Sequence, residues 1–350
     1  MSPTPGRSHP ALRQLTRARP IGWLLAVVLL TASCSGTDSG ESADPSGTPT
    51  DSATGSPTDS ATDQPTPAPS PSEPATIEST LRTRVGAAPC GIIGGGGRIW
   101  VSLYDENALV SLDPETGAEL SRAAVGTNPC GVAIGAGSVW VENWTSNDVT
   151  RVSLATGKTQ RTYAVGAAPF DVAFAGGAAW VTNNRGGSVS RVDAATGEVR
   201  EIKTGGVPVG VAVSGGLVWV TLGAPGVVAL DPRDGTITHE IPTDGLAGWT
   251  AADKRSVWVN VDETVLRIDA RTARVAETFA VGARPADGDV VDGVAWVPDR
   301  DGLLYRLRSG APVDPPVKVG VTDPFVLNEY DGQVWIADFA GTDVVRIPAG

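Results

Sequence analysis

Seven tandem copies of one short phrase, a strand-and-turn pattern within each copy and a lack of helical periodicity together predict an all-β fold, a seven-bladed β-propeller. The copies are about 40 residues apart, and each contains a tryptophan beside β-branched or other apolar residues. These tryptophans are Trp100, Trp140, Trp180, Trp219, Trp258, Trp296 and Trp335. A period of about 40–45 residues with four strands in each unit is typical of propeller blades.

Each copy contains short stretches with the composition of β-strands. In the first copy they are residues 90–95, 98–103, 108–113 and 118–125, separated by Gly-rich, Asn-containing and Thr-Gly turns. The stretches are apolar on both faces, which is expected of sheets covered on each side by a neighbouring blade. We therefore expect the repeated tryptophans to lie in the core between blades, and not to stack against a ligand.

The last copy is incomplete, and a stretch before the first copy can complete it. The copy that starts at Val319 supplies three strands and then ends. Residues 76–86 (TIESTLRTRVG) have the pattern of the missing fourth strand. We expect this N-terminal strand to join the last blade, because a closed ring leaves no unpaired strand edge. The propeller is therefore predicted to span residues 77–350.

Residues 1–33 are predicted to be a signal peptide. Four arginines and no acidic residue precede the apolar run of residues 21–30, which is too short to span a bilayer. Thr31, Ala32 and Ser33, directly before Cys34, resemble the lipobox of bacterial lipoproteins. The resemblance implies that Cys34 becomes the lipid-modified N-terminus and anchors the chain at the cell membrane, on its extracytoplasmic side. The alternative is an ordinary secretory signal followed by an incidental cysteine.

Residues 34–76 are predicted to be a disordered linker, because they are mostly Ser, Thr, Pro, Gly and acidic residues and have little apolar surface. The whole chain has a net charge of −12, and loss of the signal peptide leaves 23 basic against 39 acidic residues. An acidic surface is poorly suited to nucleic acid, so none is expected as a partner, whereas cationic ligands or divalent metal ions would be tolerated. The protein is expected to be a monomer.

The repeated phrase resembles that of a known group of propellers. Its best copies are residues 125–144 (VGTNPCGVAIGAGSVWVENW) and 165–184 (VGAAPFDVAFAGGAAWVTNN), each followed by a VxRIDxxTG-like stretch. They resemble the YVTN-type repeats and the related streptogramin-lyase and NHL-like propellers. The lyase resemblance implies an elimination that uses a histidine and a magnesium ion. However, His9 is in the signal peptide and His239 is expected in the outermost strand of the fourth copy, so no histidine is available at the channel.

The predicted binding site is the mouth of the central channel. In a propeller, the loop before the first strand of each blade and the loop after its second strand emerge on one face, around the channel. Here these loops carry aromatic, amide and carboxylate side chains, and a concave site with a few convergent polar groups is where ligands bind. The candidate residues are Tyr104, Glu142, Asn143, Trp144, Phe170, Asp171, Asn183, Asn184, Arg185, Trp249, Asp262, Asp287, Asp299, Arg300, Phe325 and Asp338, the last with its neighbour Phe339. The alternative for each of them is a structural role in capping the end of a strand.

We expect this mouth to make the protein a binding or scaffold module for a protein, a glycan or a small ligand, with no catalytic residue and no cofactor. The alternative is a metal-dependent enzyme, either a lyase or a hydrolase of the sugar-lactonase type. Its Ca²⁺ or Mg²⁺ would be held in the channel by oxygen ligands. The residues that supply such ligands are Glu142, Asp171, Asn183, Asp287 and Asp299.

Cys90 and Cys130 occupy equivalent positions in the first two copies, each in the phrase PCG. They should lie at the start of the innermost strands of adjacent blades, where we estimate that the Cα atoms are about 6–7 Å apart, within reach of a disulfide. Export would permit oxidation. We therefore predict a Cys90–Cys130 disulfide that links the first two blades at the channel mouth. The alternative is a pair of reduced thiols that suit a crowded position.

Overall fold

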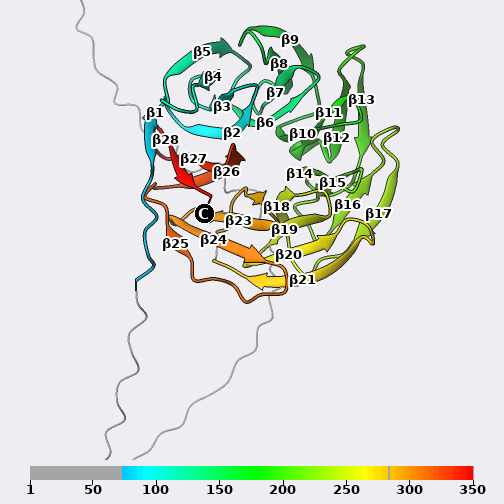
Figure 1. Ribbon diagram of the computed structural model, residues 1–350. Coiled ribbons are helices and arrows are strands. Elements are labelled where there is room, and N and C mark those ends of the chain that lie inside the picture. Colours follow the sequence, from blue (N-terminus) through cyan, green and yellow to red (C-terminus); the bar gives the residue numbers. More distant parts are fainter. Residues whose placement is uncertain (1–72, 283, 350) are drawn as a thin grey trace, which may run out of the picture. The chain divides into compact units, whose positions relative to one another are not determined.

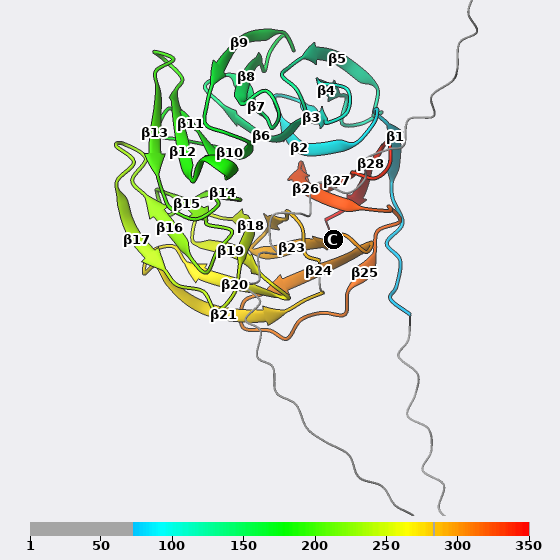
Figure 2. The ribbon, with the colours of Figure 1, turned by 180° about the vertical axis from the view of Figure 1, so that it is seen from behind.

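Seven four-stranded antiparallel sheets form a ring in the computed structural model, which describes residues 73–282 and 284–349 (Figures 1 and 2). Six sheets consist of four consecutive strands in chain order. The seventh combines the first strand with the last three, in the order β1-β28-β27-β26. This arrangement confirms the predicted seven-bladed propeller and its closure by an N-terminal strand.

We number the blades from 1 (β2–β5) to 7 (β26–β28 with β1). The innermost strands, which surround the channel, are β2 (Pro89–Gly95), β6 (Pro129–Gly135), β10 (Pro169–Ala175), β14 (Val211–Ser214), β18 (Ala247–Ala252), β22 (Asp289–Val291) and β26 (Pro324–Tyr330). The second strands, which carry the repeated tryptophans, are β3 (Arg98–Leu103), β7 (Ser138–Asn143), β11 (Ala178–Asn183), β15 (Leu217–Thr221), β19 (Ser256–Val261), β23 (Val294–Asp299) and β27 (Gln333–Asp338).

The third strands are β4 (Ala108–Leu112), β8 (Asp148–Ser153), β12 (Ser188–Asp193), β16 (Val227–Leu230), β20 (Thr264–Asp269), β24 (Leu303–Arg308) and β28 (Asp343–Pro348). The outermost strands are β5 (Glu119–Ala124), β9 (Thr159–Ala164), β13 (Val199–Lys203), β17 (Ile237–Ile241), β21 (Arg274–Ala280), β25 (Val317–Lys318) and β1 (Leu81–Arg84). A short 3₁₀ helix, η1 (Asn184–Gly186), follows β11. In this described part of the chain, no helix has the length and apolar character needed to cross a membrane.

Strand β1 closes the ring by pairing with β28. The pairing runs from Leu81 opposite Arg346 to Arg84 opposite Asp343. The Arg82 guanidinium adds an ion pair with the Asp343 carboxylate (3.1 Å). The first strand of the domain therefore covers the outer edge of the last blade, which would otherwise present unpaired backbone groups to other chains.

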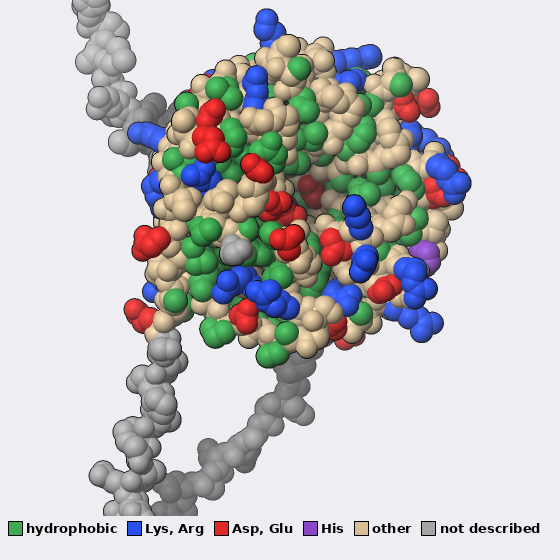
Figure 3. Space-filling view, in the orientation of Figure 1, with side chains coloured by type: hydrophobic (Ala, Val, Ile, Leu, Met, Phe, Trp, Pro, Cys, Tyr) green, Lys and Arg blue, Asp and Glu red, His purple; other side chains and the backbone are tan. Residues whose placement is uncertain are grey.

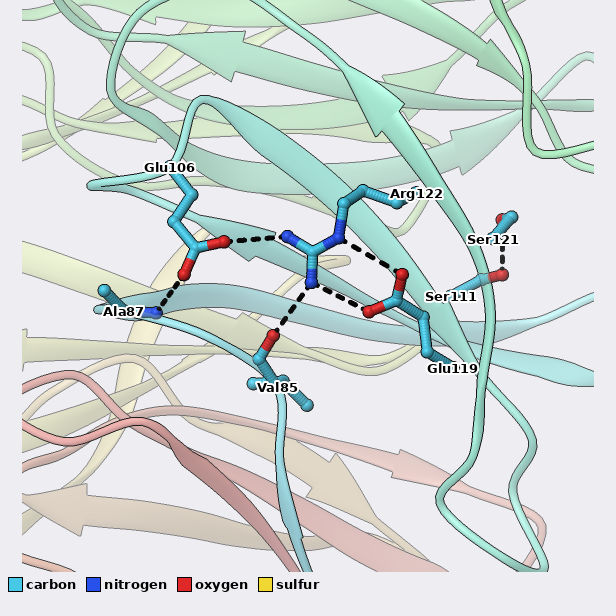
Figure 4. A network of polar contacts seen from close by, with 7 residues as sticks. All are labelled: Val85, Ala87, Glu106, Ser111, Glu119, Ser121 and Arg122. Carbon is cyan, nitrogen blue, oxygen red and sulfur yellow. Dashed lines mark hydrogen bonds and ion pairs between the residues drawn. The ribbon is translucent and has the colours of Figure 1, made fainter.

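The segment that crosses from β1 to the innermost strand of blade 1 is held by a polar network (Figure 4). Arg122 donates a hydrogen bond to the Val85 carbonyl (3.1 Å) and forms ion pairs with Glu106 and Glu119 (both 2.8 Å). The other oxygen of Glu106 accepts a hydrogen bond from the Ala87 amide (2.7 Å). Ion pairs between exposed side chains contribute little on their own. The bonds to the backbone of residues 85 and 87 are what attach the crossing segment to blade 1.

The seven repeated tryptophans are buried between blades, as predicted, and none is more than 3% exposed. Trp140 illustrates the environment, since it lies in one hydrophobic cluster with Val181 and Val192 of the next blade. Its indole nitrogen donates to the Gly135 carbonyl of its own blade (3.2 Å), so that the one polar atom of the ring is satisfied.

The arginine of the VxRIDxxTG-like pattern also has a structural role. In five blades it lies directly opposite the tryptophan of the neighbouring strand, with the guanidinium carbon 5.2–6.0 Å from the ring centroid. Arg151 continues to the next blade, where it donates to the Ala194 carbonyl (2.8 Å). Arg346 does the same at the Pro114 carbonyl of blade 1 (2.7 Å). The pattern therefore encodes contacts between blades.

The predicted disulfide between Cys90 and Cys130 is present. It joins β2 to β6, and the two Cα atoms are 4.9 Å apart, closer than the separation estimated from the ring geometry. Cys90 is fully buried. The bond therefore links the innermost strands of blades 1 and 2 at the channel.

The predicted signal peptide, the lipid attachment site Cys34 and the linker up to residue 72 lie outside the described residues. The end of the predicted linker is described. The Ala75 carbonyl accepts a hydrogen bond from the Lys318 amide (2.7 Å), and Thr76 pairs with Lys318 at the edge of blade 6. Backbone contacts with the propeller are therefore present from Ala75 onward.

Candidate functional site

Six aromatic side chains form an unbroken series of ring contacts at one end of the channel. We call them the aromatic mouth, which consists of Tyr104, Trp144, Phe170, Trp249, Phe325 and Phe339. Phe170 stacks on Trp249 with ring centroids 5.0 Å apart. Trp144 and Phe170 meet edge to face (5.3 Å), and so do Phe325 and Trp249 (5.2 Å). Phe339 joins Phe325 (5.0 Å) to Tyr104 (5.8 Å).

These six residues come from blades 1, 2, 3, 5 and 7, by the two routes that the sequence predicted. Phe170, Trp249 and Phe325 are on the innermost strands β10, β18 and β26. The other three are in the loops that follow the second strands β3, β7 and β27. Phe325 is buried and the others are half-buried, so that the mouth presents aromatic surface without being fully open.

A cavity of about 190 Å³ lies behind the aromatic mouth, enclosed by the innermost strands. Phe170, Trp249 and Phe325 line one end of it. Among the described residues that line it there is no Lys, Arg or His; the polar side chains are those of Asp171, Thr250, Asp287, Asp289 and Asn328. The space-filling view shows a hollow at the centre of the ring with acidic side chains inside it (Figure 3). The cavity is therefore acidic in composition and closed by aromatic rings at the mouth.

Two of the cavity carboxyl groups influence each other. Burial raises the pKa of Asp171 to about 7, against the lowering effect of the Val211 and Val172 amides, which donate to its two oxygens (2.8 and 2.7 Å). Burial also raises the pKa of Asp287 well above its usual range, and the nearby Asp171 and Asp289 raise it further. Both carboxyl groups therefore bind a proton at higher pH than an exposed aspartate does.

Asp289 connects blades 6 and 7. Its Oδ2 accepts hydrogen bonds from the Asn328 side-chain amide and the Glu329 backbone amide (both 2.9 Å), and its Oδ1 accepts one from the Val290 amide (2.8 Å). Burial raises the pKa of Asp289, while these donors lower it. This carboxyl group is therefore engaged on both oxygens, unlike Asp287.

Glu142 of β7 is fully buried beside this group of carboxyls. Its Oε1 accepts a hydrogen bond from the Gly131 amide (2.7 Å). Its Oε2 is buried and has no partner in the described residues. Burial raises the pKa of Glu142 well above its usual range, and Asp171 and Asp148 add to the rise while the Gly131 and Cys130 amides oppose it. Glu142 in turn contributes, after burial, to a raised pKa of Tyr104 in the aromatic mouth.

Four of the polar candidates lie at one repeated position, the third residue after the core tryptophan, and are buried: Asn143, Asn183, Asp299 and Asp338. Each forms hydrogen bonds with the loop or strand that follows it, or with the segment that leads into the first strand of its own blade. Asn143 donates to Asp148 (2.6 Å) and Thr150 (3.0 Å). Asp338 accepts a hydrogen bond from the Asp323 amide (2.9 Å). These contacts agree with a structural role in capping the ends of strands, the alternative to ligand binding, because they hold the loop ends around the mouth.

The remaining candidates lie around the rim. Arg300 forms a two-pronged ion pair with Asp323 (2.7 and 2.5 Å) and lies over the Phe325 ring (5.0 Å). Arg185 is exposed on η1 and lies over the Trp144 ring (5.5 Å). Asn184 is buried and donates to the Pro208 carbonyl (3.2 Å), whereas Asp262 is exposed in a turn.

The oxygen ligands named for the enzyme alternative do not converge on one point. Asn183 donates to Ser188 and Ser190 (3.0 and 2.9 Å), and Asp299 accepts from the Asp301 amide (2.8 Å), each within its own blade. In residues 73–282 and 284–349, no group of three or more His, Cys, Asp or Glu side chains is placed to hold a metal ion. His239 is exposed on β17, at the outer edge of blade 4.

Sequence reasoning did not find three polar residues of the cavity, Asp289, Thr250 and Asn328. Asp289 could have been found, because it lies two residues after Asp287 and side chains alternate along a strand. Thr250 carries no such signal, since it follows Trp249 in a copy that lacks the usual proline. Its hydroxyl is buried and has no hydrogen-bond partner in the described residues.

Comparison with solved structures shows similarity at the level of the fold. A hydrazine synthase of Kuenenia stuttgartiensis superimposes with a TM-score of 0.64 and 14% sequence identity, over 75% of this chain and 96% of that one. The WD40 β-propeller domain of Doa1 superimposes with a TM-score of 0.67 and 7% identity, over 78% of this chain and 97% of that one. No protein-family model matches the chain. No curated protein matches its sequence either. At these identities, the structural comparisons establish a β-propeller and carry no function with them.

Proposed function

We propose that this protein is a binding module whose recognition surface is the aromatic mouth. The observation that carries the proposal is the series of six aromatic rings, drawn from five blades, that closes one end of an acidic cavity. A propeller fold is consistent with a binding or scaffold role. Aromatic side chains dominate the energetic centres of binding surfaces, because they bury a large area at a low cost in conformational entropy.

The chemistry of the mouth selects among ligands. Half-buried rings favour a ligand with a flat apolar face, such as a sugar ring, an aromatic group or an apolar side chain of a partner protein. Arg300 is held by Asp323, so that its charge is already compensated. The carboxyl groups behind the rings disfavour an anionic ligand. A neutral or cationic glycan, small molecule or protein segment therefore fits the mouth best.

We also propose that the module acts outside the cytoplasm, as a monomer attached to the cell membrane through lipid on Cys34. The signal-like N-terminus and the lipobox-like sequence support this location. The Cys90–Cys130 disulfide is consistent with it, because such bonds persist in oxidising compartments. The resemblance to YVTN-type repeats belongs to the same proposal. A metal-dependent lyase or lactonase has less support, since its oxygen ligands are divided between the channel and separate loops.

Tryptophan fluorescence can test the mouth directly. Of the nine tryptophans in the described residues, seven are buried in the core, and only Trp144 and Trp249 are half-buried at the mouth. We would use the chain from residue 34 onward with Cys34→Ser, so that no lipid is attached. Probes are neutral and amino-sugar oligosaccharides, small aromatic amines, and envelope proteins in a pull-down. A ligand at the mouth should change the emission and protect it from quenching by acrylamide.

Variants at the mouth provide the control. Trp249→Ala should weaken binding of a mouth ligand by about 30-fold or more, which corresponds to about 2 kcal/mol. Leu120→Ala, at an exposed position on the outer strand β5, should leave binding unchanged. The proposal fails if no probe changes the fluorescence and if the Trp249→Ala chain captures the same partners as the unchanged chain.

A further inference from the structure

One repeated position makes a bridge to the next blade in blades 1, 3, 4 and 5, and Glu142 occupies it in blade 2. The position is the second residue after each core tryptophan, and we call it the bridge position. Its occupants are Ser102, Glu142, Thr182, Thr221, Asn260, Pro298 and Ala337.

At three of these positions a hydroxyl makes the same two hydrogen bonds. Ser102 accepts from the Gly91 amide of its own blade (2.8 Å) and donates to the Cys130 carbonyl of the next blade (2.6 Å). Thr182 accepts from the Asp171 amide (3.0 Å) and donates to the Val209 carbonyl (2.8 Å).

The same bridge continues into blades 4 and 5. Thr221 accepts from the Gly210 amide (2.8 Å) and donates to the Gly248 carbonyl of the next blade. In blade 5 the Asn260 side-chain amide supplies the donor half, to the Ala286 carbonyl (3.0 Å). The acceptor is in every case the second residue of the repeated phrase in the next blade. These side-chain bridges therefore join blade 1 to 2, 3 to 4, 4 to 5 and 5 to 6, and in each of them the bridging group is a donor. Pro298 and Ala337, in blades 6 and 7, have no side-chain donor.

Glu142 makes the first half of this bridge and has no partner for the second. Its Oε1 accepts from the Gly131 amide (2.7 Å), as the hydroxyls do in blades 1, 3 and 4. Its Oε2 is fully buried and unpaired in the described residues. We call the contact between two adjacent blades a seam. By analogy with the other blades, the acceptor at the seam between blades 2 and 3 is the carbonyl of Phe170. An ionised carboxylate cannot donate to a carbonyl, whereas a carboxylic acid can.

We propose that Glu142 carries a proton in the folded protein at neutral pH and donates it from Oε2 to the Phe170 carbonyl. The carboxylic acid of Glu142 then bridges blades 2 and 3, as hydroxyl groups bridge the neighbouring pairs of blades. The ionisable groups that face Glu142 support this state. Asp148 on its own blade, Asp171 on blade 3 and Tyr104 on blade 1 are acidic or neutral, and no cation is among them. Burial, Asp171 and Asp148 raise the pKa of Glu142, against the lowering effect of the Gly131 and Cys130 amides.

The site is built to accept this side chain. A Cβ atom on Gly131 would come within 3.3 Å of Glu142 Cγ and 3.1 Å of Asp171 Oδ1, so that glycine leaves room for both carboxyl groups. The bridge also reaches the aromatic mouth. Phe170 supplies the accepting carbonyl, and Trp144, which contacts the Phe170 ring, is two residues after Glu142. Glu142 is thus a positioning residue, whose proton holds the Trp144–Phe170 pair in place.

The consequence is a seam that weakens as the pH rises. A carboxyl group with a pKa higher in the folded than in the unfolded chain stabilises the folded state most below its unfolded pKa, near 4.5. This stabilisation is lost progressively as the pH rises through the folded pKa. Ionisation would leave a buried charge beside Asp171 and remove the donor of the bridge. The bridge between blades 4 and 5 is made by the hydroxyl of Thr221, which does not titrate in this range, so it does not share this behaviour.

Melting temperatures from about pH 5 to about pH 9 test the proposal, with four chains that start at residue 34 and carry Cys34→Ser. Glu142→Gln keeps the shape and always has a donor, and Glu142→Thr restores the hydroxyl of the other blades. As the pH rises, the melting temperatures of both variants should increase relative to that of the unchanged chain. The increase should be roughly 2–4 °C for each unit by which folding raises the pKa of Glu142. Thr221→Val removes a hydroxyl bridge that contacts no carboxyl group, so its loss of melting temperature should be the same at every pH.

Infrared spectroscopy adds a direct readout. At neutral pH the unchanged chain should show a carbonyl stretch of a protonated carboxylic acid that is missing in Glu142→Gln, while the Thr221→Val spectrum keeps it. The proposal is overturned if the difference in melting temperature between Glu142→Gln and the unchanged chain is independent of pH. It is equally overturned if Glu142→Gln removes no carboxylic acid band.

Discussion

Arg151 in blade 2 donates a hydrogen bond to the carbonyl of Ala194 in blade 3, at 2.8 Å, while its guanidinium lies over the ring of Trp140. The Arg151 side chain therefore packs against the core of blade 2 and links the outer part of this blade to blade 3. The inner part of the same seam is formed by Glu142 and the strand that contains Phe170. Blades 2 and 3 are thus joined at two levels, by Arg151 on the outside and by the bridge position beside the channel.

Loss of the outer link should destabilise the propeller. Arg151→Ala removes the ring contact and a charge-assisted hydrogen bond, and should lower the free energy of unfolding by about 2–3 kcal/mol. Arg151→Lys keeps the charge but not the planar fork, and should recover only part of this loss. Arg200→Ala, on an exposed position of β13, should change the stability by less than about 0.5 kcal/mol. Urea denaturation measures all three, and equal stability of Arg151→Ala and Arg200→Ala would contradict the role of Arg151.

The disulfide should make a large contribution to stability. It closes a loop with a sequence separation of 40 between the two innermost strands. Replacement of Cys90 and Cys130 by serine should therefore cost about 2–5 kcal/mol, measured by urea denaturation without reductant. Mass spectrometry of unreduced peptides is the companion measurement. Two freely alkylated cysteines in the native protein would contradict the bond itself.

Removal of β1 should open the ring. A chain that starts at Val85 lacks the outer strand of blade 7, whereas a chain that starts at Glu73 retains it. The shorter chain should melt at a lower temperature and self-associate, because the edge of β28 would then be unpaired. Differential scanning fluorimetry and light scattering compare the two. If they behave alike, closure by β1 is not needed for stability.

The cavity carboxyls should make the protein less stable as the pH rises from about 4 to about 7. The pKa of Asp171 is raised from 3.8 in the unfolded chain to about 7 in the folded one, so that its stabilising effect is complete below about pH 4 and is lost as the pH passes through 7. Each pKa unit of difference corresponds to roughly 1.4 kcal/mol.

Asp171→Asn should flatten this dependence, although it should lower stability overall, because an asparagine cannot accept from both the Val211 and Val172 amides with its side-chain oxygen. Asp105→Asn, which is exposed, serves as the control and should keep the slope of the unchanged chain. A slope in Asp171→Asn as steep as that of the unchanged chain would show that Asp171 does not contribute to it.

The aromatic mouth was accessible from the sequence because of the repeat. Once the copies were aligned on their tryptophans, Phe170 and Phe325 shared one position at the start of the innermost strand, and Trp144 and Phe339 shared another after the second strand. The roles of the polar candidates could not be assigned in the same way. Asn143 and Asp338 occupy mouth positions in the alignment, yet their side chains form hydrogen bonds with Asp148 and with the Asp323 amide and so hold the loops of the mouth in place.

The sequence by itself determined the seven-bladed architecture, its closure by β1, the burial of the core tryptophans and the pairing of Cys90 with Cys130. These features follow from spacing alone, because a repeat places equivalent residues at equivalent points around a ring. Only the tertiary structure decided that Phe170 stacks on Trp249 from a non-adjacent blade, that Asp171 and Asp287 share one cavity, and that Oε2 of Glu142 is left without a partner. Such contacts depend on the direction of side chains around the channel and on their loss of solvent, which no local pattern of residues specifies.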